Sequence, residues 1–355
     1  MILVVNAGSS SLKVSLFTTD LTQIADGAVS NIGGASILTL NDQSADITAK
    51  DHASALQQML GALDQAGHKT TDISAVAHRV VHGGAYFSEP ARVTPEVIEA
   101  IRACIPLAPL HNPVNLLGIE AINALRPDMP QFVSFDTAFH ATNPDIAKRY
   151  AIPDQQYAQG IQRYGFHGSS YANMVSEFGD ALPDRLLALH LGNGASLCAI
   201  RYGQSVASSM GYSPMSGLVM GTRCGEIDGA AVLRIAHDLG LSEADHLLNK
   251  QSGLKGLAGD NNMKNLLARS DANARFAVDH FCYWAAREAG SAIVAMGGVD
   301  AIAFTGGIGE NAAPIRDKIL DHLAFLGSVD VHIIPADEER QIARDAIRIQ
   351  SDSTS

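Results

Sequence analysis

The sequence predicts an α/β fold made of two related halves. Apolar runs of strand length alternate with stretches of helical periodicity, which is typical of this class. The 32 glycines of the 355-residue chain gather in short polar turns that follow the apolar runs. A strand–turn–strand pattern near the N-terminus also returns about half a chain later, with Ser11-Leu12 aligned on Ser196-Leu197. This repetition favours two similar domains.

The first half opens with a predicted hairpin, in which Met1–Val5 and Leu12–Thr18 are strands joined by a polar turn. Two helices are predicted to begin at Thr94-Pro95 and at Asn112-Pro113, where the first residue of each pair would cap the helix and the proline would follow it. Asn143-Pro144-Asp145 is the predicted hinge between the halves.

The second half contains a similar hairpin, then two helices, a buried strand and a last helix. In chain order these segments are Arg185–His190, Ser196–Ile200, Asp228–Leu239 ending at Gly240, Ala272–Ala295 ending before Gly297-Gly298, Ala301–Phe304 and Asp337–Arg348. The polar residues from there to Ser355 are expected to fray. The predicted domains are residues 1–145 and 146–335, followed by a C-terminal helix in residues 336–355.

Composition excludes several classes of partner. The net charge of −12 argues against nucleic acid, which attracts basic surfaces. The longest apolar runs, such as Leu186–Leu191, are far too short to span a bilayer, so no membrane partner is expected. No secretory leader follows Met1, which predicts a cytoplasmic location. The four cysteines form no CxxC pair and are interpreted as reduced thiols.

The first glycine-rich turn, Asn6–Lys13, offers backbone N–H groups, three hydroxyls and an ammonium, which suit a phosphate chain. It lacks the Walker A spacing, and a polar hairpin turn without a ligand explains it equally well. Gly306–Asn311, near the other end of the chain, links a buried strand to a helix. Its glycines would let the adenosine and phosphates of a nucleotide lie against bare backbone.

Two charged residues follow predicted strands in the first half. Arg79 ends an apolar run and therefore needs an anion, which is either a carboxylate of the protein or a substrate. Asp136 follows the run Phe132-Val133, where open α/β sheets place ligands. Its position alone favours the alternative that it caps the next helix.

Two further candidates lie in the second half. His167 stands between glycines and is interpreted as a donor to phosphate oxygens, although a lone histidine is more often structural. Arg223 lies in a glycine-bracketed loop and would clamp developing phosphoryl charge. The alternative for Arg223 is an internal ion pair with Glu226 or Asp228.

Together these segments resemble the acetate kinase family, within the larger group of sugar kinases, actin and Hsp70-type ATPases. Eight stretches match in order: Asn6–Lys13, His78–Gly84, Pro109–Pro113, Phe135–His140, Arg163–Gly168, His190–Gly194, Met220–Arg223 and Thr305–Asn311. The resemblance implies duplicated actin-like (ribonuclease H-like) domains with a nucleotide cleft between them, and a homodimer. It implies reversible phosphoryl transfer between ATP and acetate, giving acetyl phosphate and ADP.

The resemblance also implies roles for individual residues. Asn6 and Glu338 match the positions that bind Mg²⁺ (or Mn²⁺), so the last helix should return to the first domain, and Lys13 matches a phosphate-hairpin lysine. Arg79, Arg223, Asp136 and His167 match the catalytic positions. The nucleotide-binding positions are His190, Leu191, Gly192, Asn193, Gly194, Asn262, Met263, Lys264, Gly307, Ile308, Gly309, Glu310 and Asn311.

Several positions depart from the family pattern. Asn262-Met263-Lys264 stands where an Asp-x-Arg pair is usual near the adenosine, so the nucleotide preference is open. Cys224 replaces a usual serine beside Arg223, and we expect this neighbour to lower the pKa of the thiol and make it sensitive to alkylation. The chain is also short for the family, with the loss expected between Phe17 and Ala75.

Two alternative functions follow from the same residues. A propionate or butyrate kinase differs only in the volume of the acid pocket, for which Val81 and Pro214 are candidates, and one methylene changes specificity by only ~1–3 kcal/mol. A non-catalytic ATP-binding sensor is the alternative of another class. Retention of all four catalytic positions argues against the sensor.

Overall fold

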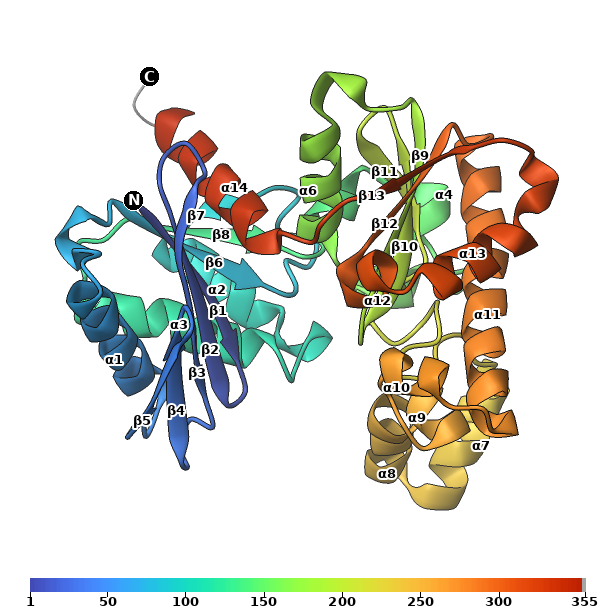
Figure 1. The fold of residues 1–355 in the computed structure, drawn as a ribbon, viewed down its shortest axis with the longest axis horizontal. Helices are drawn as coiled ribbons and strands as arrows, with labels where there is room; N and C mark the ends of the chain where they lie inside the picture. Colours follow the sequence, from blue (N-terminus) through green and yellow to red (C-terminus); the bar gives the residue numbers. More distant parts are fainter. Residues whose placement is uncertain (353–355) are drawn as a thin grey trace. The chain divides into compact units, whose positions relative to one another are not determined.

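The computed structural model describes residues 1–352 and confirms the predicted α/β class. Its contacts divide the chain into two compact units (Figure 1). Unit 1 is Met1–Phe139 together with the segment from Asp337 onward, and unit 2 is His140–Ala336. Each unit has one sheet of its own. Within the described residues, no helix is both long and apolar enough to cross a membrane.

Unit 1 contains an eight-stranded sheet in the order β5-β4-β3-β2-β1-β6-β8-β7. Strands β1 to β5 form an antiparallel meander, and β6 and β8 run parallel to β1. The strands are β1 Ile2–Gly8, β2 Ser11–Phe17, β3 Gln23–Ser30, β4 Ser36–Leu40, β5 Gln43–Ile47, β6 Ala75–Val80, β7 Ala91–Arg92 and β8 Gln131–Phe135. The helices are α1 His52–Gln65, α2 Pro95–Ala103, α3 Asn112–Leu125 and α14 Glu338–Asp352.

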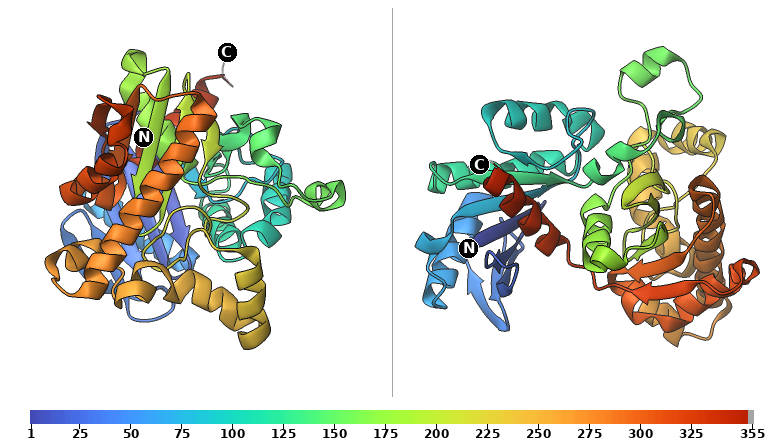
Figure 2. Two further views of the ribbon diagram at one scale, coloured as in Figure 1. Left: turned by 90° about the vertical axis from the view of Figure 1, so that its right-hand side faces the viewer. Right: turned by 90° about the horizontal axis from the view of Figure 1, so that it is seen from above.

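Apolar side chains of β1 point alternately to the two faces of this sheet, which explains why helices cover both faces. Leu3 and Val5 belong to the core beneath α1 and α3, whereas Ile2 and Val4 belong to the core beneath α14. Successive side chains of a strand point to opposite faces, so one apolar strand serves two cores. Figures 1 and 2 show α14, in red, lying against the sheet of unit 1, although it is the last helix of the chain.

Unit 2 contains a five-stranded sheet in the order β11-β10-β9-β12-β13. The strands are β9 Arg185–Leu191, β10 Ala195–Arg201, β11 Gln204–Ser208, β12 Ala301–Thr305 and β13 Asp330–Ile333. The helices are α4 Asp145–Lys148, α5 Asp154–Ala158, α6 Gly168–Phe178, α7 Gly229–Leu239, α8 Leu241–His246, α9 Gly253–Ala258, α10 Met263–Ala268, α11 Ala272–Met296, α12 Gly306–Asn311 and α13 Ala313–His322. The long helix α11, orange in Figure 2, packs along β9, β10 and β11.

The two sheets share a common core of five strands. The order β3-β2-β1-β6-β8 in unit 1 corresponds to β11-β10-β9-β12-β13 in unit 2, with three antiparallel strands followed by two that run parallel to the third. The offset of 185 residues aligns Ser11, the first residue of β2, with Ser196 at the start of β10. The predicted duplication is therefore present in the strand order.

Most predicted helix ends are correct, because their caps are local. Thr94 accepts a hydrogen bond from the backbone N–H of Val97 at 3.3 Å, and Asp228 caps α7 in the same way. Helix α11 ends at Gly297, whose φ of 77° suits glycine. The last helix continues four residues beyond the predicted Arg348, to Asp352, where fraying was expected. The expected fraying of residues 353–355 lies outside the described residues.

The predicted cap at Asn112 is wrong. Asn112 is the first residue inside α3, and no side-chain bond caps this helix. Its side chain instead accepts from the backbone N–H of His82 at 3.1 Å and donates to the carbonyl of His82 at 2.9 Å. The local pattern assigned the Asn112 amide to the helix end, but in the structure it binds the backbone of His82 instead.

Candidate active site

The carboxyl ends of β1, β6 and β8 meet at one edge of the sheet of unit 1. The register pairs Val5 with His78 and Arg79 with Ser134, so Asn6 lies level with Arg79, and Asp136 follows the end of β8. Ligands bind at this edge in open α/β sheets. Parallel pairing thus gathers residues that are more than 50 positions apart in the sequence.

Arg79 and Asp136 form a two-point ion pair at this edge. The Nε and Nη2 atoms of Arg79 donate to the two carboxylate oxygens of Asp136 at 2.9 and 2.8 Å. Glu338, at the start of α14, lies 3.6 Å from the same Nε. The partner that the half-buried arginine requires is therefore a carboxylate of the protein. The alternative of Asp136 as a helix cap is wrong, since within residues 1–352 its carboxylate accepts from Arg79 and from no backbone N–H group.

Negative charge exceeds positive charge in this charged cluster, which comprises Arg79, Asp136, Glu338 and Glu339. Burial, together with Glu338, raises the pKa of Asp136 despite the opposing effect of Arg79. Burial and Glu338 also raise the pKa of Glu339. Burial opposes the charge of Arg79, but the carboxylates outweigh it and raise the pKa of the guanidinium. Three carboxyl groups around one guanidinium form an environment that favours an additional cation.

Asn6 and Lys13 lie beside each other in the first hairpin, paired across β1 and β2. Asn6 is half-buried and Lys13 is exposed. Within residues 1–352, no hydrogen bond or ion pair joins either side chain to the charged cluster. The two residues thus lie at the same end of the sheet as the cluster but, within residues 1–352, form no hydrogen bond or ion pair with it.

In unit 2, His167 is held in a fixed orientation before α6. Its backbone adopts the left-handed conformation, with φ at 59°, and its Nδ1 lies 2.9 Å from the hydroxyl of Ser196. That hydroxyl also contacts the hydroxyl of the fully buried Tyr171. The imidazole stacks on His190 with ring centroids 4.2 Å apart, and Ser170 contacts Nδ1 of His190 at 2.8 Å. We call His167 and His190 the histidine pair.

Gly194 brings His167 and Arg223 together. A Cβ atom built on Gly194 would lie 3.4 Å from Nε2 of His167 and 3.7 Å from Nη1 of Arg223. Both polar atoms therefore border the same small space in front of the glycine. The absence of a side chain leaves room for a ligand that approaches the backbone closely.

Arg223 is half-buried, and the predicted alternative of an internal ion pair is wrong. Its Nη1 donates to the carbonyl of Pro214 at 3.1 Å, and within residues 1–352 it forms no ion pair with Glu226, Asp228 or any other carboxylate. Asp228 instead caps α7. Burial lowers the pKa of the Arg223 guanidinium. A partly desolvated cation without a counter-ion is well suited to bind an anion.

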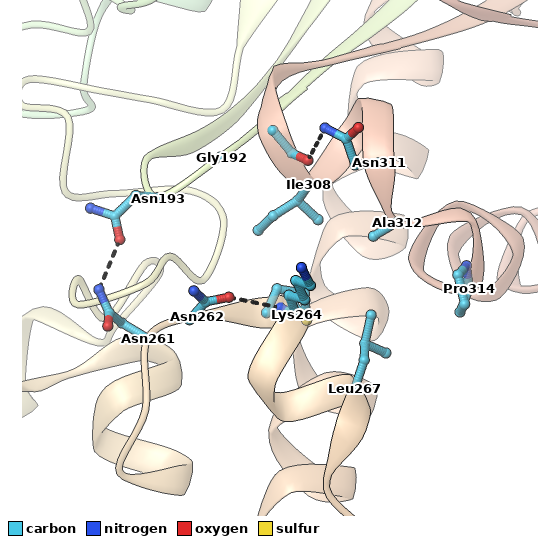
Figure 3. A pocket seen from close by; sticks show the side chains of 12 residues that line it. Gly192, Asn193, Asn261, Asn262, Lys264, Leu267, Ile308, Asn311, Ala312 and Pro314 are labelled. Atoms are coloured by element: carbon cyan, nitrogen blue, oxygen red, sulfur yellow. Dashed lines mark hydrogen bonds between the residues drawn. The ribbon is translucent and has the colours of Figure 1, made fainter. Parts of the chain in front are cut away.

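A pocket of about 900 Å³ lies in unit 2, between the β9–β10 turn, α10 and α12 (Figure 3). Amide and apolar side chains line it, Lys264 is its single cationic residue, and its twelve lining residues include no carboxylate. They are Gly192, Asn193, Asn261, Asn262, Met263, Lys264, Leu267, Gly307, Ile308, Asn311, Ala312 and Pro314. Figure 3 shows Ile308 projecting toward the helix that carries Lys264. The volume and the mixed lining suit a nucleotide-sized ligand.

Eight of the thirteen predicted nucleotide-binding residues line this pocket, and five do not. His190 stacks on His167 instead, and Glu310 accepts a hydrogen bond from the backbone N–H of Ala336 at 3.0 Å. Leu191 and Gly309 are buried in the core, and Gly194 faces His167 and Arg223. A contiguous motif alternates between lining a pocket and packing behind it, so only part of its residues reach the ligand space.

Comparison with known proteins places the chain in a family. The model of the acetokinase family matches residues 1–352. An acetate kinase from Clostridium botulinum is 41% identical over 394 residues, which cover 98% of this chain and 99% of the relative. The chain belongs to the acetokinase family. It is therefore a member of a kinase family, as the sequence predicts.

Solved structures of the acetokinase family have the same fold. An acetate kinase from Porphyromonas gingivalis gives a TM-score of 0.92 at 35% identity, with 98% of this chain and 99% of that chain covered. A propionate kinase from Francisella tularensis also gives 0.92 at 35% identity, with 97% and 98% covered. The duplicated α/β architecture is thus that of the acetokinase family.

The expectation that the neighbouring Arg223 lowers the pKa of the Cys224 thiol is wrong. Burial raises the pKa of the Cys224 thiol, and Glu226 adds to the effect. The thiol donates to the carbonyl of Gly225 at 3.3 Å, and the desolvated neighbour Arg223 does not outweigh these influences. We therefore expect Cys224 to react more slowly with alkylating reagents than an exposed thiol does.

Several site residues of this acetokinase family member have only weak sequence signals. Ser196 is the residue that aligns with Ser11 in the internal repeat, and this correspondence was its only signal. Tyr171 and Asn115 lie in no motif, and Thr137 lies in the matching stretch Phe135–His140 but is not among its predicted site residues. Their roles arise from contacts with residues far away in the sequence, which no local pattern encodes.

Proposed function

We propose that this protein is an acetate kinase that transfers the γ-phosphoryl group of ATP reversibly to acetate. The observation that carries the proposal is Arg223, a half-buried guanidinium without a carboxylate partner in the described part of the chain, beside Nε2 of His167. These two groups suit the charge that develops on a phosphoryl group in transfer. The nearby pocket suits ATP, with the adenine among Met263, Leu267 and Ile308.

The reaction needs little proton chemistry. Acetate is ionised at neutral pH, so a carboxylate oxygen attacks the γ-phosphorus directly, the bond to the β,γ-bridging oxygen breaks, and ADP leaves with that oxygen. Asp136 is therefore an orienting group that fixes the guanidinium of Arg79, and it is not assigned as a general base. Arg79 in turn offsets the repulsion between the two anionic substrates.

The residues of unit 1 fit a magnesium ion brought in with the nucleotide. Mg²⁺ prefers oxygen ligands and uses one or two carboxylates together with substrate phosphates and water. Within residues 1–352, no ready-made group of three or more His, Cys, Asp or Glu ligands is present, which fits such shared coordination. Glu338 would hold the ion, and the amide oxygen of Asn6 would contribute at the same sheet edge. When bound, the ion neutralises phosphate charge.

The activity test is acyl phosphate formation from Mg-ATP, trapped as the hydroxamate, with acetate, propionate and butyrate as separate acceptors. We expect the highest kcat/KM with acetate. Propionate is the second candidate substrate, because a propionate kinase is among the similar structures and one methylene changes specificity little. Failure to form product with any of the three acids would overturn the proposal and favour the ATP-binding sensor.

Two further features belong to the same proposal. We propose a homodimer, as the family resemblance implies, and size-exclusion chromatography with light scattering tests it. We also propose a cytoplasmic location, which the four free cysteines support because reduced thiols persist in reducing compartments.

A further inference from the structure

The first turn of α3 contacts three other segments of unit 1 through side-chain amides, namely the end of strand β1, helix α2 and the segment after β6. Asn112 and Asn115 are 0% and 4% exposed. Asn112 pairs with both backbone groups of His82 and also donates to the carbonyl of Ile101 at 3.3 Å. Asn115 accepts from the backbone N–H of Val81 at 3.1 Å and donates to the carbonyl of Ala7 at 3.1 Å. These amides therefore serve the backbone of other segments.

The segment after β6 depends on such side chains. Strand β6 ends at Val80, yet the next three backbone N–H groups are buried and need partners. Val81 donates to Asn115, His82 donates to Asn112, and Gly83 donates to the hydroxyl of Thr137 at 3.1 Å. The segment that follows Arg79 and contains Val81, a candidate residue of the acid pocket, is thus held by side chains after the strand ladder has ended.

Asn115 is the one residue of this group that also reaches the first hairpin. Ala7 follows Asn6 and precedes the turn at Gly8, and Val81 lies two residues after Arg79. The amide supplies one acceptor to Val81 and one donor to Ala7, a pairing that neither a carboxylate nor an apolar side chain can provide. A shift of β1 or of the segment after β6 would leave a buried backbone group without its hydrogen-bond partner, which destabilises the fold.

We infer that Asn115 is a positioning residue. It holds the first hairpin, which we assign to the phosphate groups of ATP, at a fixed distance from the Arg79–Val81 segment, which we assign to acetate. The inference rests on the proposed function, since it assigns the first hairpin to one substrate and the Arg79–Val81 segment to the other. Misalignment of reacting groups by about 1 Å can lower a rate about 10²-fold. Asn115 should therefore affect the chemical step more than the binding of either substrate.

The test compares Asn115→Asp and Asn115→Ala with the wild type in the trapped acetyl phosphate assay. Asn115→Asp keeps the volume and the acceptor for Val81, but a carboxylate cannot donate to the carbonyl of Ala7. We expect kcat to fall about 30- to 100-fold in both variants, with KM for acetate and for Mg-ATP within about threefold of the wild type. Thermal unfolding of each variant verifies that it is folded.

Ser15→Ala is the matched control for a lost buried hydrogen bond. The Ser15 hydroxyl is buried in unit 1 and donates to the carboxylate of Asp26 at 3.1 Å, and its pairing with Val4 places it in the middle of the sheet, away from the turn of the first hairpin. We expect its Tm to fall while kcat stays within about twofold. A folded Asn115→Asp variant with wild-type kcat, or with raised KM values and unchanged kcat, would overturn the inference alone. An inactive wild type would overturn the proposed function first.

Discussion

The two sheets have the same five-strand core but present opposite chemistry at corresponding edges. In unit 1 the carboxyl ends of β1, β6 and β8 carry the charged cluster, with carboxylates in excess. In unit 2 the turn after β9 lies beside the histidine pair, an amide-lined pocket and Arg223, which has no carboxylate partner among residues 1–352. One edge offers negative charge, whereas the other offers positive charge and neutral donors.

This difference shows that a duplicated scaffold fixes where a site lies but not what it does. Each hairpin returns the chain to the same sheet position, with a turn at Ser9-Ser10 in unit 1 and at Gly192-Asn193-Gly194 in unit 2. The residues placed there then differ. Carboxylates suit a cation, and an arginine without a carboxylate partner suits phosphate, so the same scaffold can carry groups that bind ligands of opposite charge.

The largest expected effect comes from removing the cation of the charged cluster. Arg79→Ala would leave the buried Asp136 without its partner, so we expect a loss of about 3–5 kcal/mol in unfolding free energy and about 10³-fold in kcat/KM for acetate. Urea unfolding and the hydroxamate assay measure the two effects. Asp136→Asn should lower turnover about 10²-fold. Near-normal turnover in that variant would remove Asp136 from the mechanism.

Arg185→Ala is the matched control for Arg79→Ala. Arg185 forms the same type of two-point pair, with Asp300 in unit 2, but both side chains are 36% exposed. An exposed ion pair contributes little to stability, so this variant should remain active and nearly as stable as the wild type. Equal losses in Arg79→Ala and Arg185→Ala would contradict the distinction between the charged cluster and an ordinary ion pair.

The next effect tests the ligand space of unit 2. Gly194→Ala would place a methyl group within 4 Å of His167 Nε2 and Arg223 Nη1, in the space assigned to phosphate. We expect kcat/KM for Mg-ATP to fall about 10- to 100-fold, because a donor displaced from a developing charge costs at least that much. Gly290→Ala in α11 is the control, since no atom lies within 4 Å of the new methyl group. An active Gly194→Ala variant would place the phosphate elsewhere.

The third effect concerns acid stability. Burial lowers the pKa of His78 from 6.5 to about 4, and the same holds for His82 and His140. Between these values the unfolded chain binds a proton that the folded chain does not, so stability is full above pH 6.5 and falls as the pH drops toward 4. Each histidine should contribute a loss of about 2 kcal/mol between pH 7 and pH 5.

His78→Gln isolates one of these contributions, because His78 lies in β6 and contacts Gln131 at the end of the sheet away from Asp136. Urea unfolding at pH 7 and pH 5 should show a pH-dependent loss about 2 kcal/mol smaller than that of the wild type. An unchanged difference between the two pH values would mean that His78 does not resist protonation in the folded state.

The smallest expected effect is at Cys224. Because its thiol pKa is raised, alkylation at pH 7.5 should be slower than that of an exposed thiol, and Cys224→Ser should leave kcat within about twofold. Mass spectrometry after a timed iodoacetamide pulse measures the alkylation of Cys224, and the hydroxamate assay measures the kcat of Cys224→Ser. Rapid labelling that ATP suppresses would restore the original expectation of a reactive thiol at the site.

The sequence predicted much of the fold because its signals are local. The first hairpin, the Thr94 and Asp228 caps and the end of α11 at Gly297 depend on residues within a few positions of one another. The prediction failed at Asn112, where the same residue type has a long-range use. Competition between a cap and a tertiary partner is invisible until the partner is in place.

What the sequence by itself determined is the α/β class, the repeated hairpin and the set of chemical groups available for catalysis. Only the tertiary structure decided that Arg79 has a carboxylate partner whereas Arg223 has none within residues 1–352, that His190 stacks on His167 instead of lining the pocket, and that burial raises the pKa of the Cys224 thiol. The physical reason is that charge and reactivity depend on desolvation and on partners, and both are set by packing between distant segments.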